Sequence, residues 1–237
     1  MSLSFKPLRI KICPQPGHCP GLYIPTNIPQ EHPQYGQSLP CACERRRQAE
    51  IAQRTLPLEL RRMTFEAYQV NDQNRKAVEA ARHCAADPWA GTPLLTVVGS
   101  NQTGKTHLAA AIINQVLCQG EPAYIRNVPD LLDDLRAGLD DARFWRTFDQ
   151  AKTAPVLLLD DLGAQSDSGS GDPYAVTWTQ DKLYRIINTR LVHQLPTLVT
   201  TNCTRKMLPP RIAARLWNPR YGVVIAVAAV AAEKVAA

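Results

Sequence analysis

The chain has 237 residues, enough for one full α/β domain and a smaller appendage. Hydrophobic residues make up 45% of it and charged residues 20%, which is ordinary for a soluble globular protein. No stretch reaches the roughly 18 consecutive apolar residues that a membrane-spanning helix needs. The N-terminus lacks the apolar core of a signal peptide, so we expect a cytoplasmic protein without a membrane partner. The net charge of +6 permits a polyanionic partner but does not demand one.

Residues 1–43 are rich in Pro, Gly and Gln and carry Cys13, Cys19, Cys41 and Cys43. A segment this short and proline-rich cannot bury enough surface to order itself alone. Four thiolates that hold a tetrahedral Zn²⁺ would supply the missing stability. Neither cysteine pair has the usual C-x₂-C spacing, and a flexible leader with free thiols is the alternative. Because the chain has seven cysteines, an odd number, we expect reduced thiols or metal ligands rather than disulfides.

The pattern turns helical and basic over residues 44–63, which we expect to form a linker helix. A charge run of this kind is most often a solvated helix face, and an arm that contacts DNA or a protein partner is the alternative. A third domain is expected over residues 64–217. Its first helix covers about residues 74–86 and ends at Asp87-Pro88, because the residue before proline is steered out of the helical region.

An apolar run over residues 94–98 ends in a glycine-rich loop that opens an alanine-rich helical pattern. The loop matches G-x-x-x-x-G-K-[ST] in the strand–loop–helix context that this phosphate-binding motif requires. Its backbone N–H groups receive phosphate oxygens, Lys105 reaches the β- and γ-phosphates, and Thr106 is a Mg²⁺ ligand. The sequence therefore predicts an ATP site with Mg²⁺, bound by Gly99, Ser100, Asn101, Gln102, Thr103, Gly104, Lys105, Thr106 and His107.

Strands alternate with helices through the rest of this domain, which indicates an α/β fold with a doubly wound parallel sheet. Helices are expected over residues 107–119, 130–137, 140–152 and 178–193, and strands over residues 123–128, 155–161 and 197–201. The loop over residues 164–173 is expected to be flexible from its Ser, Gly and Asp content.

Polar residues that follow the buried strands complete the predicted catalytic site. Asp160 and Asp161 end one strand at the edge where open α/β sheets bind ligands. Asp160 suits the Mg²⁺ shell, and Asp161 suits the base that orients and deprotonates the attacking water. Asn202, after the next strand, is placed to hydrogen-bond the γ-phosphate or the water. Arg211 or Arg215, on a short helix beyond it, can stabilise the transition state in a neighbour's site, with a surface role as the alternative.

The order of these motifs resembles AAA+ ATPases, which are P-loop NTPases: a phosphate loop, Leu-Leu-Leu-Asp-Asp, Thr-Thr-Asn, then Arg-x-x-x-Arg-Leu. Residues 104–109 and 160–163 are similar to the DnaC/DnaI-type helicase loaders and the related IstB-type transposition helpers. Cysteines before an arginine-rich linker and Met-Thr-Phe-Glu resemble DnaC-like proteins with an N-terminal zinc-binding region. The resemblance covers residues 64–216 and, more loosely, the first 63.

The resemblance implies a role for each motif. Residues 99–106 would be the Walker A loop, Asp160 and Asp161 the Walker B acids, Asn202 the sensor-1 residue and Arg215 the arginine finger. It further implies ATP-controlled self-association on single-stranded DNA and delivery of a replicative hexameric helicase. Loaders of this family carry a DNA-contacting element in the helix pair over residues 130–152. The DNA candidates there are Arg136, Arg143, Arg146 and Lys152, with a solvated face as the alternative.

Three departures from the family pattern leave other functions open. Pro16 stands where such proteins often have the second Cys of a C-x₂-C pair, so that Cys19 or His18 must substitute. The loop after Asp161 is longer than expected. Residues 218–237 have the composition of an atypical or truncated tail without a sensor-2 arginine. The alternatives are therefore an IstB-like ATPase that assists a transposase and an adaptor that binds nucleotide and DNA without hydrolysis.

Overall fold

A computed structural model describes residues 13, 19–25, 29–31, 35–88, 93–139, 141–163 and 173–227, without the side chains of residues 173–176. Pro16 and His18, the loop over residues 164–172 and the tail from residue 228 lie outside the described residues. In the part that is described, no helix combines the length and apolar character that crossing a bilayer requires.

Five parallel strands form the central sheet, in the order β4-β5-β6-β3-β7. They are β3 (Leu94–Val98), β4 (Ala123–Asn127), β5 (Val156–Asp160), β6 (Thr197–Thr201) and β7 (Gly222–Ala226). β3, β5 and β6 lie inside the sheet, where strands covered on both faces need continuous apolar runs such as Val-Leu-Leu-Leu. The α/β fold with a parallel sheet that the sequence predicts is confirmed.

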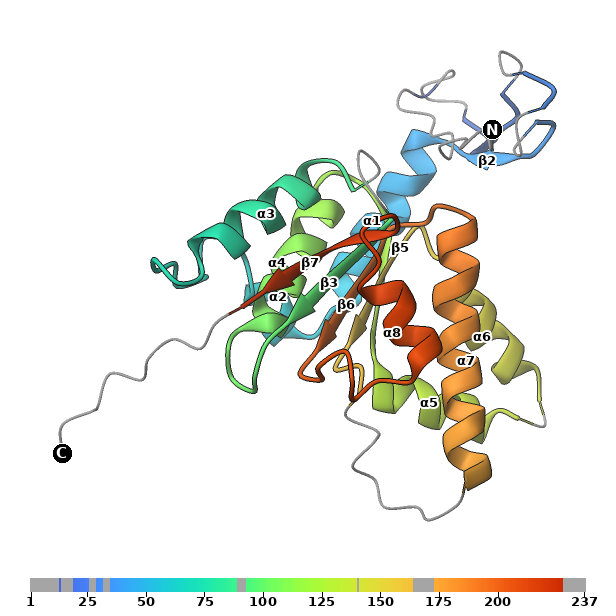
Figure 1. The fold of residues 1–237 in the computed structure, drawn as a ribbon. Coiled ribbons are helices and arrows are strands. Elements are labelled where there is room, and N and C mark those ends of the chain that lie inside the picture. Colours follow the sequence, from blue (N-terminus) through green and yellow to red (C-terminus); the bar gives the residue numbers. More distant parts are fainter. Residues whose placement is uncertain are drawn as a thin grey trace.

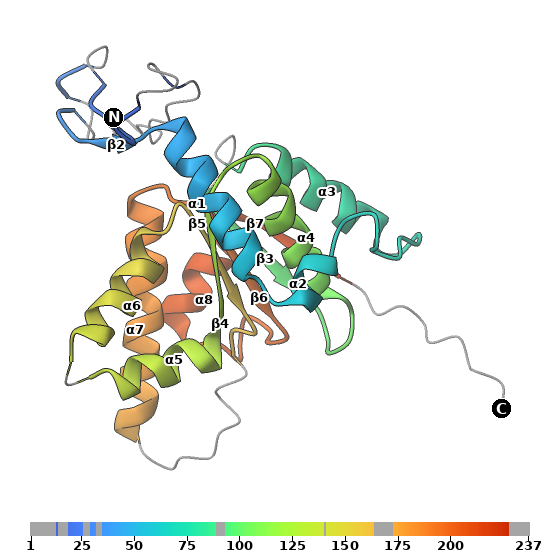
Figure 2. The same cartoon turned by 180° about the vertical axis from the view of Figure 1, so that it is seen from behind.

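Helices cover both faces of the sheet (Figures 1 and 2). One face carries α1 (Ala42–Thr55), α2 (Leu58–Arg62), α3 (Arg75–Ala86) and α4 (Lys105–Cys118). The other carries α5 (Val128–Ala137), α6 (Ala142–Thr153), α7 (Pro173–Val192) and α8 (Pro210–Leu216). A hydrophobic core lies on each face of the sheet, and alternate residues of β5 belong to one core or the other. Leu158 packs with α3 and α4, whereas Leu157 and Leu159 pack with the α5–α8 layer.

The described N-terminal region is a small hairpin joined directly to α1. Strand β1 (Leu22–Tyr23) pairs antiparallel with β2 (Leu39–Pro40), and the Cys41 N–H donates to the Gly21 carbonyl oxygen at 2.9 Å. The basic linker predicted over residues 44–63 contains two helices, α1 and α2. The first ends before Leu56-Pro57-Leu58, where the sequence pattern also ends the helix, and Pro57 is the N-cap of α2. The hairpin lies at the end of the sheet opposite the strand arrowheads (Figure 1), away from the edge where ligands bind.

The structure also differs from the sequence-based expectation for residues 218–237. Within that predicted tail, Gly222–Ala226 form the edge strand β7, which pairs in parallel register with β3 from Leu94 to Val98. Ile225 and Val227 are buried in the core shared with α3 and α4. Val223, Val224 and Ile225 are β-branched and suit a strand, but the alanine-rich residues that follow them mask this short pattern in the sequence.

Candidate functional site

The predicted phosphate loop lies between β3 and α4 and has the tight backbone that the motif requires. Gly104 is the N-cap of α4 with φ of +86°, a left-handed conformation that glycine adopts without strain. A Cβ at Gly99 would lie 2.4 Å from the Val227 carbonyl oxygen, so no other residue fits there. Gln102 also has a positive φ, of 62°, at a position where many such loops carry glycine.

Lys105 is folded back into the loop. Its side chain is nearly buried, and its Nζ donates a hydrogen bond to the Ser100 carbonyl oxygen at 2.7 Å. The Thr103 hydroxyl donates to the same oxygen at 3.0 Å. These two bonds hold the loop curled, with the ammonium inside the concavity that phosphate oxygens would enter.

Thr106 and Asp160, which are separated by 54 residues in the chain, meet at the carboxyl edge of the sheet. The Thr106 hydroxyl donates to the Asp160 carboxylate and lies 3.2 Å from each of its oxygens. Burial raises the pKa of Asp160 above its usual value, while hydrogen bonds from Thr200 and Thr106 work against that rise. A hydroxyl and a carboxylate in contact are suitable oxygen ligands for Mg²⁺.

The Thr200 side chain links the two acids, and no sequence motif assigns this role to it. Its hydroxyl donates to Asp160 Oδ1 at 2.6 Å and accepts from the Asp161 N–H at 2.9 Å. Asp161 turns sharply out of β5 with φ of +62°, and this bond supports that backbone conformation. Thr200 can be placed beside the two acids only from the register of β5 and β6, in which Leu159 pairs with Val199, the residue before Thr200.

Asn202 is brought against the phosphate loop, as its assignment requires. Its Nδ2 donates to Asn101 Oδ1 at 3.0 Å, although 101 residues separate the two in the chain. On the other side of the loop, His107 Nε2 lies 3.0 Å from the Thr64 carbonyl oxygen, and its ring meets Tyr68 edge-on. His107 thus anchors the segment from Thr64 to Tyr68 beside Gly104.

The two candidate finger arginines lie on α8 and contact α7. Arg215 Nη2 donates to the Tyr184 hydroxyl at 2.9 Å and to Asn188 Oδ1 at 3.2 Å. The Arg211 guanidinium stacks on the Tyr184 ring, 3.9 Å from its centroid. These contacts hold both guanidinium groups on the outer surface of the α7–α8 layer.

The four N-terminal cysteines form a cluster. The Sγ atoms of Cys13, Cys19, Cys41 and Cys43 all lie within 4.8 Å of one another, and those of Cys13 and Cys43 are 3.9 Å apart. Tetrahedral zinc with Zn–S bonds of about 2.3 Å requires sulfurs about 3.8 Å apart. The Gly21 N–H donates to Cys19 Sγ at 3.4 Å, a contact that stabilises negative charge on sulfur. The donor set and spacing therefore fit zinc.

Three of the four predicted DNA residues lie in ion pairs on the α5–α6 layer. Arg136 pairs with Asp133 at 2.9 Å, Arg143 with Asp141 at 2.6 Å and Lys152 with Asp149 at 2.9 Å. Arg146 is exposed. Their role on DNA stays a prediction.

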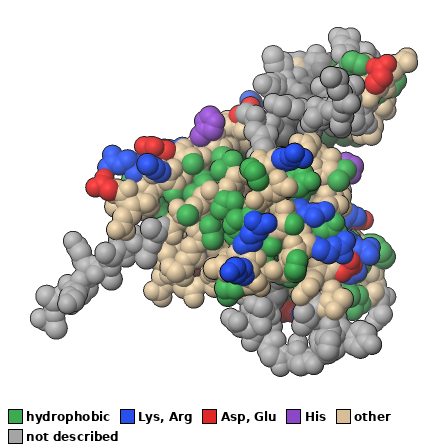
Figure 3. Space-filling model, viewed as in Figure 1, with side chains coloured by type: hydrophobic (Ala, Val, Ile, Leu, Met, Phe, Trp, Pro, Cys, Tyr) green, Lys and Arg blue, Asp and Glu red, His purple; other side chains and the backbone are tan. Residues whose placement is uncertain are grey.

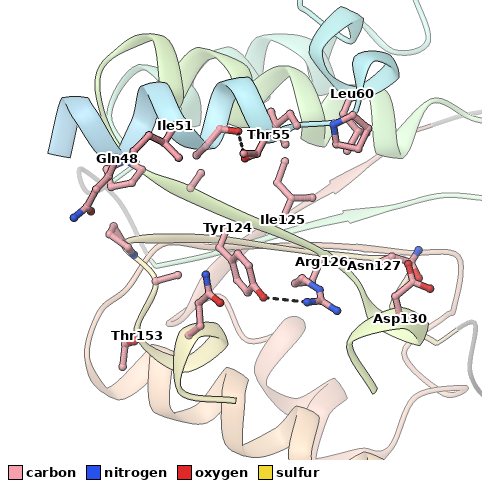
Figure 4. Close-up of a pocket in the computed structure, with 18 of the residues that line it drawn as sticks. Gln48, Ile51, Thr55, Leu60, Tyr124, Ile125, Arg126, Asn127, Asp130 and Thr153 are labelled. Atoms are coloured by element: carbon pink, nitrogen blue, oxygen red, sulfur yellow. Dashed lines mark hydrogen bonds between the residues drawn. The ribbon is translucent and has the colours of Figure 1, made fainter. Parts of the chain in front are cut away.

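A second concavity lies between α1 and the edge strand β4 (Figure 4). This groove of about 880 Å³ is lined by apolar residues of α1, such as Ile51 and Ala52, and by polar residues of β4 and α5. In the groove the Arg126 Nη1 donates to the Tyr124 hydroxyl at 3.0 Å. None of the predicted catalytic residues lines this groove.

Comparison with known proteins agrees with this geometry. The family model described as "IstB-like ATP binding protein" matches residues 41–205 of the chain. The chain belongs to this family. Its sheet matches the AAA+ fold of solved DnaA and DnaC structures, with TM-scores of 0.62 and 0.57. The chain is thus a member of an ATP-binding family, and the matched span includes Lys105, Thr106 and Asp160.

Relatives of this IstB-like chain include both helicase loaders and insertion-sequence proteins. The replicative helicase loader DnaI of Bacillus subtilis is 31% identical over 109 residues, 46% of this chain and 32% of the relative. An IS1162 ATP-binding protein of Pseudomonas fluorescens is 39% identical over 69 residues, 29% of this chain and 30% of the relative. A DnaI crystal structure, 27% identical, superposes over 73% of this chain and 92% of the other with a TM-score of 0.58. The chain thus spans about a third of the length of the two sequence relatives.

Proposed function

We propose that the chain is a Mg²⁺-dependent ATPase that acts as a DnaC-like helicase loader. In this function, ATP binding and hydrolysis drive its self-association on single-stranded DNA and its assembly with a replicative hexameric helicase. The observation that carries the ATPase assignment is the contact of Thr106 with both oxygens of Asp160, beside the folded-in Lys105. The DnaI relative supports the loader assignment.

Each residue of the site has a defined role in this proposal. The loop N–H groups from Gly99 to Thr106 and the Lys105 ammonium hold the phosphates in place. Thr106 and Asp160 would hold Mg²⁺, which neutralises charge on the β- and γ-phosphate oxygens. Asp161 accepts a proton from the attacking water, and Asn202 orients that water. Arg215 of a neighbouring copy stabilises the charge of the transition state.

A second candidate is an ATPase that assists a transposase, favoured by the family model and by the insertion-sequence relative. The two functions share one ATPase core and differ in the protein partner. Both functions require contact with DNA, and Arg136, Arg143, Arg146 and Lys152 are the candidates for it that the family resemblance suggests.

The partner decides between these functions. The full chain, immobilised with ATP, Mg²⁺ and single-stranded DNA, is exposed to extract of its own cells, and bound proteins are identified by mass spectrometry. A loader recovers a replicative helicase in an ATP-dependent manner. Recovery of a transposase without helicase would replace the loader by the transposition function.

We expect the cysteine cluster to hold one Zn²⁺ per chain. Four thiolates fix the hairpin to α1, and metal binding supplies the energy that so small a region lacks. Metal analysis of the purified chain should give about one zinc. Cys41→Ser should lose it, whereas Cys118→Ser, outside the cluster, should keep it. A metal-free chain whose β1 and β2 amides still resist hydrogen exchange would contradict the zinc site.

Thr200→Val should shift the acid limb of ATP turnover to higher pH. Turnover requires ionised Asp160, so activity disappears as the pH falls through the pKa of this carboxyl group. Burial raises that pKa, and the Thr200 hydroxyl counteracts the rise. Removing the hydroxyl should therefore raise the pKa of Asp160 further. The acid limb of the pH–rate profile should move to higher pH, with Thr204→Val as an exposed control; an unmoved profile would exclude this role for Thr200.

A further inference from the structure

The layer formed by α7, α8 and their connections is strongly positive. Residues 173–221 contain eight Lys and Arg residues and a single acid, Asp181. Arg190 is fully buried and hydrogen-bonded inside the fold, and Lys182 packs on the Trp178 and Phe144 rings. The remaining six define what we call the basic face: Arg185, Arg205, Lys206, Arg211, Arg215 and Arg220. Figure 3 shows Lys and Arg side chains spread over α7 and α8, with few acidic side chains among them.

The α5–α6 layer has the opposite charge balance. Residues 128–153 contain four basic and six acidic residues, a net charge of −2. Arg136, Arg143 and Lys152 each pair with a nearby aspartate. The basic face has six positive charges, and the single acid in the same stretch is Asp181, whose carboxylate lies 2.8 Å from the Arg185 guanidinium. A polyanion is therefore attracted to the basic face and weakly repelled by α5–α6, because summed charge sets the field that it meets.

Aromatic rings lie among the basic residues and orient them. Tyr184 lies against two guanidinium groups, 3.9 Å from Arg211 and 4.9 Å from Arg215. Its hydroxyl accepts a bond from Arg215, so two planar donor groups are fixed before any ligand arrives. Tyr221, 38% exposed, follows Arg220 directly and offers a ring on which an unpaired base can stack. Planar guanidinium groups are suited to bidentate contact with phosphate oxygens.

We propose that the basic face binds the phosphate backbone of single-stranded DNA through its residues other than Arg215, which acts on the ATP site of a neighbouring copy. Tyr221 provides a stacking surface. This inference rests on the proposed function, because it names the surface through which that function contacts DNA. It assigns the main contact to α7, α8 and their connections rather than to α5–α6.

Binding of labelled oligothymidine by the full chain, followed by fluorescence anisotropy between 50 and 200 mM salt, tests the proposal. The test variant combines Arg205→Gln, Lys206→Gln and Arg220→Gln, which are exposed residues outside the predicted catalytic site. The matched control combines Arg136→Gln, Arg143→Gln and Arg146→Gln and removes the same charge from α5–α6. The salt slope is the decrease in the logarithm of the binding constant with the logarithm of the salt concentration. Each phosphate contact contributes about 0.7 to it in single-strand binding. The test variant should lose about tenfold to 100-fold in affinity and about 2 in slope, and the control should lose less than about threefold.

Further variants separate a lost contact from a lost fold. Arg205→Lys with Arg220→Lys keeps the charge and should keep the salt slope. Tyr221→Ala should weaken single-strand binding roughly tenfold without changing the slope, and should leave binding of a duplex of equal length unchanged. Strong loss in the α5–α6 control with normal binding by the test variant would overturn the proposal and leave the proposed function standing. A wild-type chain that binds no single-stranded DNA would instead overturn both.

Discussion

Lys105→Ala is expected to reduce ATP turnover by about 10²–10³-fold, the usual effect of removing one preorganised donor from a transition-state site. The Lys105 ammonium is the charged donor inside the loop and is already turned inward, 2.7 Å from the Ser100 carbonyl oxygen. Losing it removes positive charge from the place where the β- and γ-phosphates bind. Nucleotide affinity, measured with a fluorescent ATP analogue, should fall as well.

The control for this variant is Lys76→Ala, which removes an exposed lysine of α3. It should keep both affinity and turnover. The thermal unfolding of both variants should resemble that of the wild type. Turnover by Lys105→Ala within a few-fold of the wild-type value would exclude the loop as the catalytic phosphate site.

Arg215→Ala is expected to keep ATP binding and to lose turnover by about 10³-fold or more, the range attributed to arginine fingers. The guanidinium is held by Tyr184 and Asn188 on the α7–α8 surface, which suits a group that acts on a neighbouring copy. Arg211→Ala, one helical turn earlier, is the matched control and should retain most turnover. The measurement is phosphate release at saturating ATP.

Mixing two inactive variants tests whether Arg215 acts between copies. A Lys105→Ala subunit has an intact Arg215, and an Arg215→Ala subunit has an intact phosphate loop. Where the two meet in an assembly, one complete site forms, so the mixture should regain a fraction of wild-type turnover. Hydrolysis that is normal in Arg215→Ala alone would remove the finger role, and a mixture without recovery would place the residue within its own subunit.

The phosphate loop and both acids are predictable from sequence because each lies in a short local pattern. The order strand, glycine-rich loop and helix identifies residues 99–106. The buried apolar run of β5 identifies Asp160, the residue with which it ends. Asn202 follows by the same reasoning, and the structure brings it to Asn101. Local patterns thus identify the residues that contribute side chains at strand ends.

Other parts of the site depend on contacts between distant segments, which no local pattern contains. Thr200 looks like an ordinary strand residue until the β5–β6 register places its hydroxyl between Asp160 and the Asp161 N–H. Strand β7 is a short β-branched run at the start of an alanine-rich segment, and its pairing with β3 makes it the edge strand of the sheet. The cysteine spacing is irregular in sequence because the β1–β2 hairpin, not a local turn, brings Cys19 near Cys41.

Steady-state phosphate release by the full chain, with and without Mg²⁺ and single-stranded DNA, is the decisive measurement of ATPase function. We predict release that requires Mg²⁺, rises when single-stranded DNA is added, and is abolished by Asp161→Asn while ATP binding persists. A chain that binds ATP tightly but releases no phosphate under any of these conditions would contradict the ATPase and leave a nucleotide-binding adaptor in its place.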